Sequence, residues 1–138
     1  MENTDNSQLD IDKLVKHWVG LSDYDLETAI AMFQTKRYLY VAFMCHQVIE
    51  KIFKAHYSKL KEELPPYTHK LIYLAQHGDF YDLLNEKQID FVLELEPLNI
   101  ETRYPEYKDR LARRLTPSYC ESLIEQTKIL QQWMKERL

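Results

Sequence analysis

Glycine is scarce in this chain, and that scarcity limits its possible folds more than any other feature. Only Gly20 and Gly78 occur among 138 residues, where average usage would give roughly 10. Tight hairpins, barrel corners and phosphate-binding loops depend on glycine, because it adopts backbone conformations that other residues avoid. The sequence therefore argues against a P-loop, a dinucleotide-binding fold and most all-β architectures, and it favours a mainly helical protein.

Apolar residues recur at helical spacing through the first half of the chain. The clearest helix spans about 38–62, where a broad apolar stripe repeats every 3.6 residues. The Leu-Pro-Pro run at 64–66 ends it, because proline cannot continue a helix and disfavours helix in the residue before it. Two earlier helices are expected over 9–20 and 22–37, separated by Gly20 as a C-cap.

Proline and threonine divide the second half into shorter pieces. Thr68 is expected to cap a short helix, Pro97 to kink or interrupt a longer one, and Pro117 to lie in the first turn of the last. The expected helices span 69–77, 86–102 and 118–138, and a charged turn spans 103–116.

These elements predict one architecture. We expect an all-α fold, an antiparallel bundle of four main helices with short extra helices. Residues 1–8 are expected to form a flexible tail and residues 9–138 a single domain, since a chain of this length fits one compact domain.

Net charge and cysteine usage indicate the binding partners and the cellular environment of the protein. The net charge of −4 gives no general attraction to nucleic acid or to an anionic membrane. Cys45 and Cys120 lie within apolar helical patterns without a CxxC partner, as in reduced proteins that lack a cysteine metal site. The acidic, polar start does not resemble a secretory signal, and no apolar run approaches ~20 residues. We therefore expect a cytoplasmic protein that does not enter the membrane.

Three polar residues share one face of the 38–62 helix. His46, Glu50 and Lys54 are spaced at i, i+4 and i+8. They can line a nucleotide site, with the histidine on a base or sugar, the glutamate orienting it and the lysine on phosphate. They can equally form a buried polar network. His46 and Glu50 supply two metal ligands without a clear third, so no metal site is predicted.

Three further polar residues lie near helix ends. His69 begins the expected short helix, where it can contact a phosphate or hydrogen-bond a neighbouring helix. Arg103 suits phosphate or carboxylate, and Tyr104 can stack on a base. Alternatively, Arg103 pairs with Glu50 and fixes the turn. We expect Arg103 to reach the row of His46, Glu50 and Lys54 and to form one polar cluster with it.

Three segments together resemble a known family. They are YLYVAFMCHQVIEKIFKAHY at 38–57, PPYTHKL at 65–71 and ETRYPEY at 101–107, followed by a last amphipathic helix. Their order and spacing resemble the HEPN domain, the nucleotide-binding domain shared by higher eukaryotes and prokaryotes. The resemblance covers roughly residues 15–137.

The resemblance implies a four- or five-helix bundle that forms a homodimer. It also implies a minimal nucleotidyltransferase as a partner, in pairs that resemble toxin–antitoxin systems. One branch of the family cleaves RNA without metal, through an Arg-x(4–6)-His motif that faces the dimer mate. Here Arg103 is followed at the required spacing by Lys108, Asp109 and Arg110, so the histidine is missing.

The sequence therefore predicts a HEPN-type protein that dimerises without catalysing a reaction. It would bind a nucleotide (ATP or GTP), a minimal nucleotidyltransferase, or both, with no other cofactor. The expected binding residues are His46, Glu50, Lys54, His69, Arg103 and Tyr104. The alternative is a metal-independent endoribonuclease toxin with a degenerate motif, in which Arg103 and His46 would act on RNA. Metal-free RNA cleavage needs an acid or base that titrates near neutral pH, for which histidine serves best.

Overall fold

The computed structural model describes residues 9–138, and the tail expected over 1–8 lies outside them. The described part is helical and contains no strand, which confirms the predicted all-α fold. Its elements are α2 (Ile11–Gln34), α3 (Tyr38–Lys61), α4 (Leu71–His77), the 3₁₀ helix η1 (Tyr81–Leu83), α5 (Glu86–Leu95), α6 (Leu98–Glu101), α7 (Pro105–Arg114) and α8 (Pro117–Lys135). Among these residues, no helix is long and apolar enough to cross a membrane.

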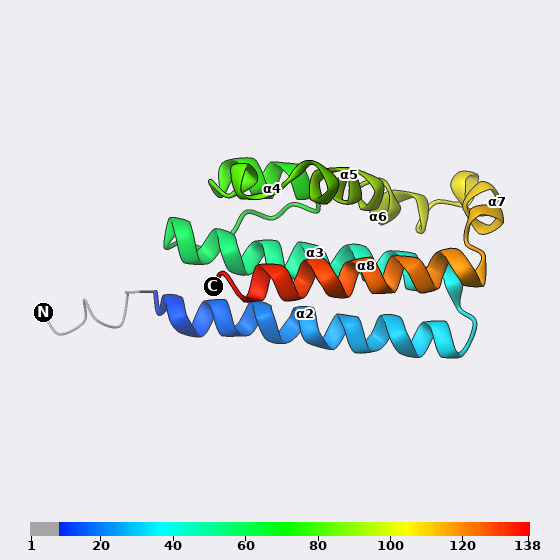
Figure 1. Ribbon diagram of the computed structural model, residues 1–138, viewed down its shortest axis with the longest axis horizontal. Helices are drawn as coiled ribbons and strands as arrows, with labels where there is room; N and C mark the ends of the chain where they lie inside the picture. Colours follow the sequence, from blue (N-terminus) through cyan, green and yellow to red (C-terminus); the bar gives the residue numbers. More distant parts are fainter. Residues whose placement is uncertain (1–8) are drawn as a thin grey trace, which may run out of the picture.

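Three long helices, α2, α3 and α8, lie side by side, and α4, α5 and α6 form a layer along α3 (Figure 1). The chain reverses direction between α2 and α3, again along α5–α6, and again in α8 (Figure 1). Helix α7 lies at the end of the bundle where α2 turns into α3 (Figure 1). The fold is therefore the predicted bundle of four main helical elements, with α5–α6 as an interrupted fourth element.

The first helix differs from the prediction. Instead of two helices divided at Gly20, α2 runs unbroken for 24 residues from its N-cap, Asp10. A Cβ at Gly20 would meet nothing within 4 Å, so no close packing requires glycine there. Ser22, two residues after Gly20, is buried and donates its Oγ hydrogen to the carbonyl of Val48 at 2.8 Å. The apolar face of α2 continues past the glycine, and tertiary packing outweighs its low helix propensity.

The second half contains two more differences. Helix α4 begins at Leu71 rather than at residue 69, and Thr68 accepts a hydrogen bond from the Lys70 amide without capping the helix. The carboxylate of Glu96 instead accepts from the Leu71 amide, across the layer. The charged segment expected as a turn forms α7, with a proline in its first turn and Leu111 as its buried residue. The break at Pro97, between α5 and α6, is as predicted.

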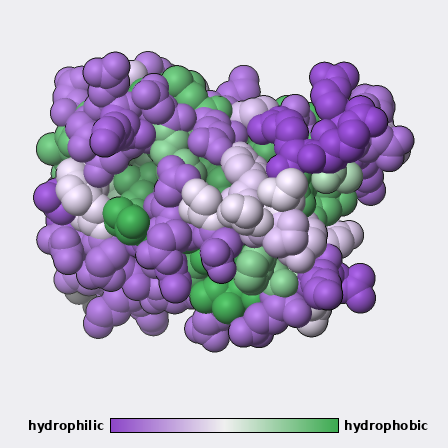
Figure 2. All heavy atoms as spheres, turned by 45° about the vertical axis from the view of Figure 1, so that its right-hand side comes forward, coloured by the Kyte–Doolittle hydropathy of each residue, from purple (hydrophilic) through white to green (hydrophobic). Residues whose placement is uncertain are grey.

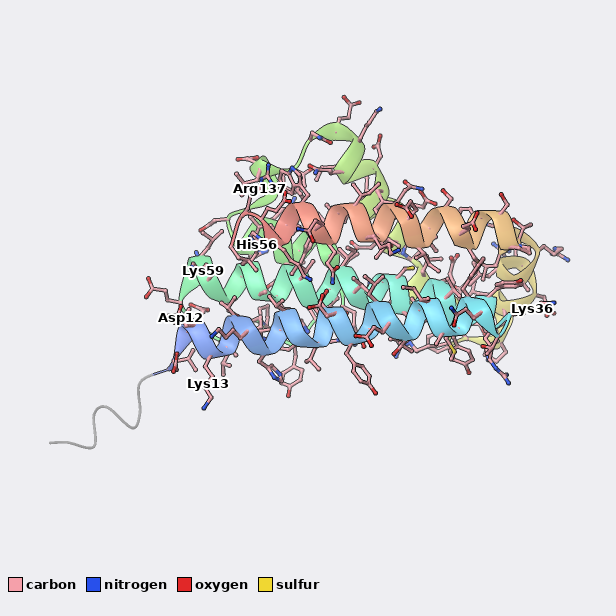
Figure 3. All side chains as sticks on the ribbon, turned by 60° about the horizontal axis from the view of Figure 1, so that its bottom comes forward. Asp12, Lys13, Lys36, His56, Lys59 and Arg137 are labelled. Carbon is pink, nitrogen blue, oxygen red and sulfur yellow. The ribbon has the colours of Figure 1, made fainter. Side chains whose placement is uncertain are left out.

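Helix α3 is the axis of the core, because it is covered by α2, by α8 and by the α4–α6 layer. Even its histidines are enclosed: His56 Nε2 donates to the carbonyl of Met134 at 2.7 Å, and burial lowers the pKa of His56. Figure 3 shows His56 near Arg137, at the C-terminal end of α8, with Lys36 at the opposite end of the bundle. On the face drawn in Figure 2 most residues are hydrophilic, and apolar residues reach the surface in separate patches.

Candidate functional site

Four of the predicted residues meet at the middle of α3. His46, Glu50 and Lys54 lie on one face of that helix, and the segment that precedes α4 brings His69 against them. We call these four residues the α3 cluster. The three members on α3 are almost fully enclosed, whereas 55% of the His69 side chain is exposed. The cluster thus connects the core to the surface through one histidine.

Glu50 is the centre of the α3 cluster. One carboxylate oxygen accepts from His69 Nδ1 at 2.9 Å, and the other accepts from Lys54 Nζ at 3.1 Å. Burial by itself would raise the pKa of this carboxyl group, but the hydrogen bonds and charges of His69 and Lys54 outweigh burial and lower it. Glu50 is therefore an anion at neutral pH, with a bond to each oxygen. Lys54 also lies over the ring of Trp18, at 5.3 Å from its centroid.

His46 is a neutral structural histidine. Its Nε2 is 3.0 Å from the carbonyl oxygen of His69, which only accepts, so Nε2 carries the proton. Its Nδ1 then accepts from the amide of Gln47 at 3.4 Å. Burial, which outweighs the attraction of Glu50, lowers the pKa of His46 to about 4. With both ring nitrogens bonded and no exposed surface, His46 joins α3 to the segment before α4 and does not face solvent.

A groove of about 680 Å³ opens beside the cluster, between the segment before α4 and the end of α5, α6 and the turn that follows. We call it the α4–α6 groove. Its polar lining consists of Thr68, His69, Lys70, Glu96, Asn99 and Arg103. Its apolar lining consists of Leu93, Pro97, Ile100 and Tyr104. The groove therefore has apolar walls with cationic side chains at its edge.

Arg103 belongs to this groove and does not pair with Glu50. Its Nε donates to the main-chain oxygen of Asn99 at 2.8 Å, and within residues 9–138 its guanidinium makes no ion pair. The expected Arg103–Glu50 pair is therefore wrong. Helix α6 ends at Glu101, and the side chain of Arg103 folds back along its last turn, while both Glu50 oxygens are already bonded. Tyr104, half exposed, lies at the same edge.

The six predicted site residues thus separate into two groups that share His69. His46, Glu50 and Lys54 bond to one another or to His69 in the core. Arg103 and Tyr104 line the groove, which His69 also lines. Because Glu50 only accepts, His69 Nδ1 donates to it, and His69 Nε2 is left without a protein partner among the described residues.

Four polar groove residues were not predicted from the sequence as site residues: Thr68, Lys70, Glu96 and Asn99. Thr68 and Lys70 flank His69, so their place follows once His69 is located. Asn99 lies four residues before Arg103, about one helical turn away. It is a single polar residue between two apolar ones, Leu98 and Ile100. That isolated polar residue is a signal that could have been used. Glu96 gives no such signal, because its role depends on contact with a distant backbone.

The chemistry available in the groove is recognition of an anion joined to an apolar or aromatic group. Arg103 and Lys70 supply permanent positive charge, and Tyr104 supplies an aromatic face. Glu96 is engaged by the start of α4, and burial raises the pKa of its carboxyl group despite those backbone hydrogen bonds. No group of three or more metal-binding side chains occurs within residues 9–138.

Comparison with known proteins identifies the family. The fold is similar to the crystal structure of TT1696 from Thermus thermophilus, with a TM-score of 0.77 at 19% sequence identity. That match covers 90% of this chain and 98% of the other, and it shows a shared fold. A search of curated proteins finds no significant match. The HEPN domain matches residues 15–138, nearly the range expected from the three segments, and the chain therefore belongs to the HEPN domain family.

Proposed function

We propose that this protein binds a purine nucleoside triphosphate, ATP or GTP, in the α4–α6 groove and does not transform it. The observation that carries the proposal is the composition of the groove, which combines cationic side chains with apolar walls and an exposed tyrosine. A nucleotide has the matching two parts, a polyanionic chain and a flat aromatic base. A volume of about 680 Å³ lies within the usual range of small-molecule sites.

Arg103 is the main phosphate-binding residue of this proposal. Its Nε is held by the Asn99 carbonyl, and its terminal nitrogens have no ion pair in the described chain. A guanidinium held in this way offers a fixed fork to phosphate oxygens with little further loss of side-chain freedom. Lys70 and His69 lie on the opposite wall and add positive charge or a hydrogen-bond donor. Tyr104 would stack on the base.

The proposal that this protein catalyses no reaction rests on its histidines. An RNA-cleaving member needs a histidine downstream of its arginine, and the expected substitute, His46, is enclosed with both nitrogens bonded. A group with a pKa of about 4 that has no access to solvent is unsuited to accept a proton from a 2′-hydroxyl group near neutral pH.

Association is a separate part of the proposal. Exposed apolar side chains, such as Tyr24, Tyr40 and Leu64, support a homodimer and a contact with a minimal nucleotidyltransferase, as in a toxin–antitoxin type pair. Light scattering at tens of micromolar protein is expected to give twice the chain mass of 16.7 kDa. A mass of one chain at that concentration contradicts the homodimer.

Calorimetric titration with ATP and GTP tests nucleotide binding. The wild-type protein is expected to bind at least one of them, and Arg103→Ala to weaken that binding about tenfold or more. Arg113→Ala is the matched control, because Arg113 is an exposed arginine on α7 that does not line the groove. No binding by the wild type contradicts the proposal. RNA cleavage that survives a chelator and is lost in Arg103→Ala would favour the endoribonuclease instead.

A further inference from the structure

Asn99 is buried in the wall of the α4–α6 groove, yet its side-chain amide has no hydrogen-bond partner within residues 9–138. Only 5% of the residue is exposed, and its main-chain oxygen, not its side chain, accepts from Arg103. Buried polar side chains in native proteins nearly always have partners. The amide is therefore available to a ligand that enters the groove.

The amide opens into the groove and not into the core. Three side-chain polar atoms of the described chain are fully enclosed and have no hydrogen-bond partner: Trp18 Nε1, Glu101 Oε1 and Thr127 Oγ1. The amide atoms of Asn99 also lack partners but are not among these three, so they keep some accessible surface. Because Asn99 lines the groove, that surface faces the space where a ligand would lie.

We propose that Asn99 is the residue that selects the base, and that the groove binds adenine nucleotides in preference to guanine nucleotides. The proposal rests on the proposed nucleotide-binding function and adds to it the identity of the base. An asparagine amide presents a donor and an acceptor side by side. Adenine presents the complementary pair, the N6 amino group as donor and N7 as acceptor.

Guanine does not offer the same complement on that edge. Its O6 and N7 are both acceptors, so the carbonyl oxygen of the asparagine would face an acceptor and lose its hydrogen bond. In a groove with mostly apolar walls, that mismatch also leaves a polar group without solvent. A bidentate contact of this kind is enough to discriminate between bases by about tenfold or more.

The arrangement of Asn99 relative to Arg103 supports this assignment. The two residues are one helical turn apart, and the bond from Arg103 Nε to the Asn99 carbonyl fixes one against the other. One ligand can therefore contact both, with its phosphates at Arg103 and its base edge at the amide. The exposed side chains of Leu93 and Ile100 line the same groove and would be covered by the faces of the base and sugar.

Calorimetric titration of the wild-type protein with ATP, GTP and 7-deaza-ATP tests the assignment without any mutation. The last ligand keeps the N6 amino group and the triphosphate but lacks the N7 acceptor. ATP is expected to bind about tenfold or more tightly than either of the other two. ATP and 7-deaza-ATP binding with equal affinity overturns the assignment of the amide to that edge.

Asn99→Asp is the variant that isolates the amide, because it keeps the shape and removes the donor. Its ratio of dissociation constants for 7-deaza-ATP and ATP is expected to fall to about one or below, because a carboxylate oxygen has no hydrogen to donate to N7. The added charge near the phosphates acts on both ligands equally and leaves that ratio unchanged. Asn85→Asp is the matched control: Asn85 is the N-cap of α5, a position that aspartate fills equally well, and it lies outside the groove.

The outcomes separate this inference from the proposed function. If the wild type binds neither ATP nor GTP, the nucleotide-binding function fails and the inference fails with it. If it binds both with similar affinity, or prefers GTP, the function stands and the role of Asn99 is overturned. A preference for ATP over 7-deaza-ATP that persists in Asn99→Asp also overturns that role. A preference for ATP over 7-deaza-ATP that is lost in Asn99→Asp and kept in Asn85→Asp supports it.

Discussion

The α3 cluster and the α4–α6 groove are built from the same kinds of residue but differ in what those residues bond to. In the cluster, Glu50 has a partner on each oxygen and His46 a partner on each nitrogen. In the groove, the guanidinium of Arg103 has no ion pair, and Asn99 has an unpartnered amide within the described chain. A polar group that is already satisfied stabilises the fold, whereas an unsatisfied one beside a cavity is available to a ligand.

His69 shows the contrast within a single side chain. Its Nδ1 is bonded to the buried carboxylate of Glu50, and its main-chain oxygen is bonded to His46. Its other ring nitrogen has no partner in residues 9–138, and its side chain lines the groove. Residue type alone therefore does not distinguish a structural histidine from one that binds a ligand. The bonding state of each nitrogen does.

The largest effect on stability is expected from Glu50→Ala. Lys54 would be left buried without its partner, and His69 would lose the acceptor for its Nδ1 hydrogen. Breaking a buried pair from one side costs about 3–5 kcal/mol, measured as the free energy of unfolding in urea. Arg114→Ala removes a half-exposed arginine whose contact with Glu101 is long, at 3.8 Å, and is expected to cost about 0–1 kcal/mol.

A double variant sharpens this test. In Glu50→Gln with Lys54→Met, no charge is left unpaired in the core, so part of the lost stability should return. If Glu50→Ala costs no more than Arg114→Ala, the cluster does not stabilise the fold and the contrast with the groove fails.

The next effect is a dependence of stability on pH that arises from His46. Burial lowers its pKa from 6.5 to about 4 in the folded chain, so below pH 6.5 the unfolded chain binds the proton more readily. The contribution is present in full above pH 6.5 and is lost as the pH falls towards 4, by about 3 kcal/mol.

Unfolding measured from pH 7 to pH 4 in wild type and in His46→Gln checks this expectation. The variant should lose less stability over that range, because glutamine can donate to the His69 carbonyl and does not titrate. His56, which is also buried and has a lowered pKa, remains in both proteins and provides a common background. Equal slopes in the two proteins would show that His46 takes up its proton without unfolding.

The smallest effect on stability is expected from Arg103→Ala, at about 1 kcal/mol or less. The residue is exposed and contributes one hydrogen bond, to the Asn99 carbonyl. The same change is expected to give the large loss of nucleotide binding described above. A change in unfolding free energy as large as that of Glu50→Ala would mean that Arg103 belongs to the structural group after all.

Helix α3 and its stopping point were predictable because periodicity and proline act locally. The predicted range of 38–62 is nearly that of α3, and the break at Pro97 occurs where expected. Gly20 and segment 103–116 were assigned wrongly for the opposite reason. Packing against α3 and α8 carries α2 through its glycine, and one buried leucine with a proline at the first turn is enough for α7.

The cluster was predicted in part. The spacing of His46, Glu50 and Lys54 predicts a shared face. His69 was expected either to bind phosphate or to hydrogen-bond a neighbouring helix, and the structure contains the second contact, from His69 Nδ1 to Glu50 on α3. The position of Arg103 was not predictable, because it depends on how α6 ends and on where that end lies relative to α3. Asn99 was missed for the same reason: an unbonded amide becomes visible only when its surroundings are known.

The hydrogen bonds of His69 also affect how the protein unfolds. The segment 62–70 joins α3 to the α4–α6 layer, and near its end it is fastened to α3 by the His46 and Glu50 bonds. Detaching the layer breaks both of these bonds and uncovers the enclosed face of α3 on which His46 and Glu50 lie. The groove wall and the long helices therefore form one cooperative unit. Their slowest amide hydrogens should exchange with solvent through the same global opening.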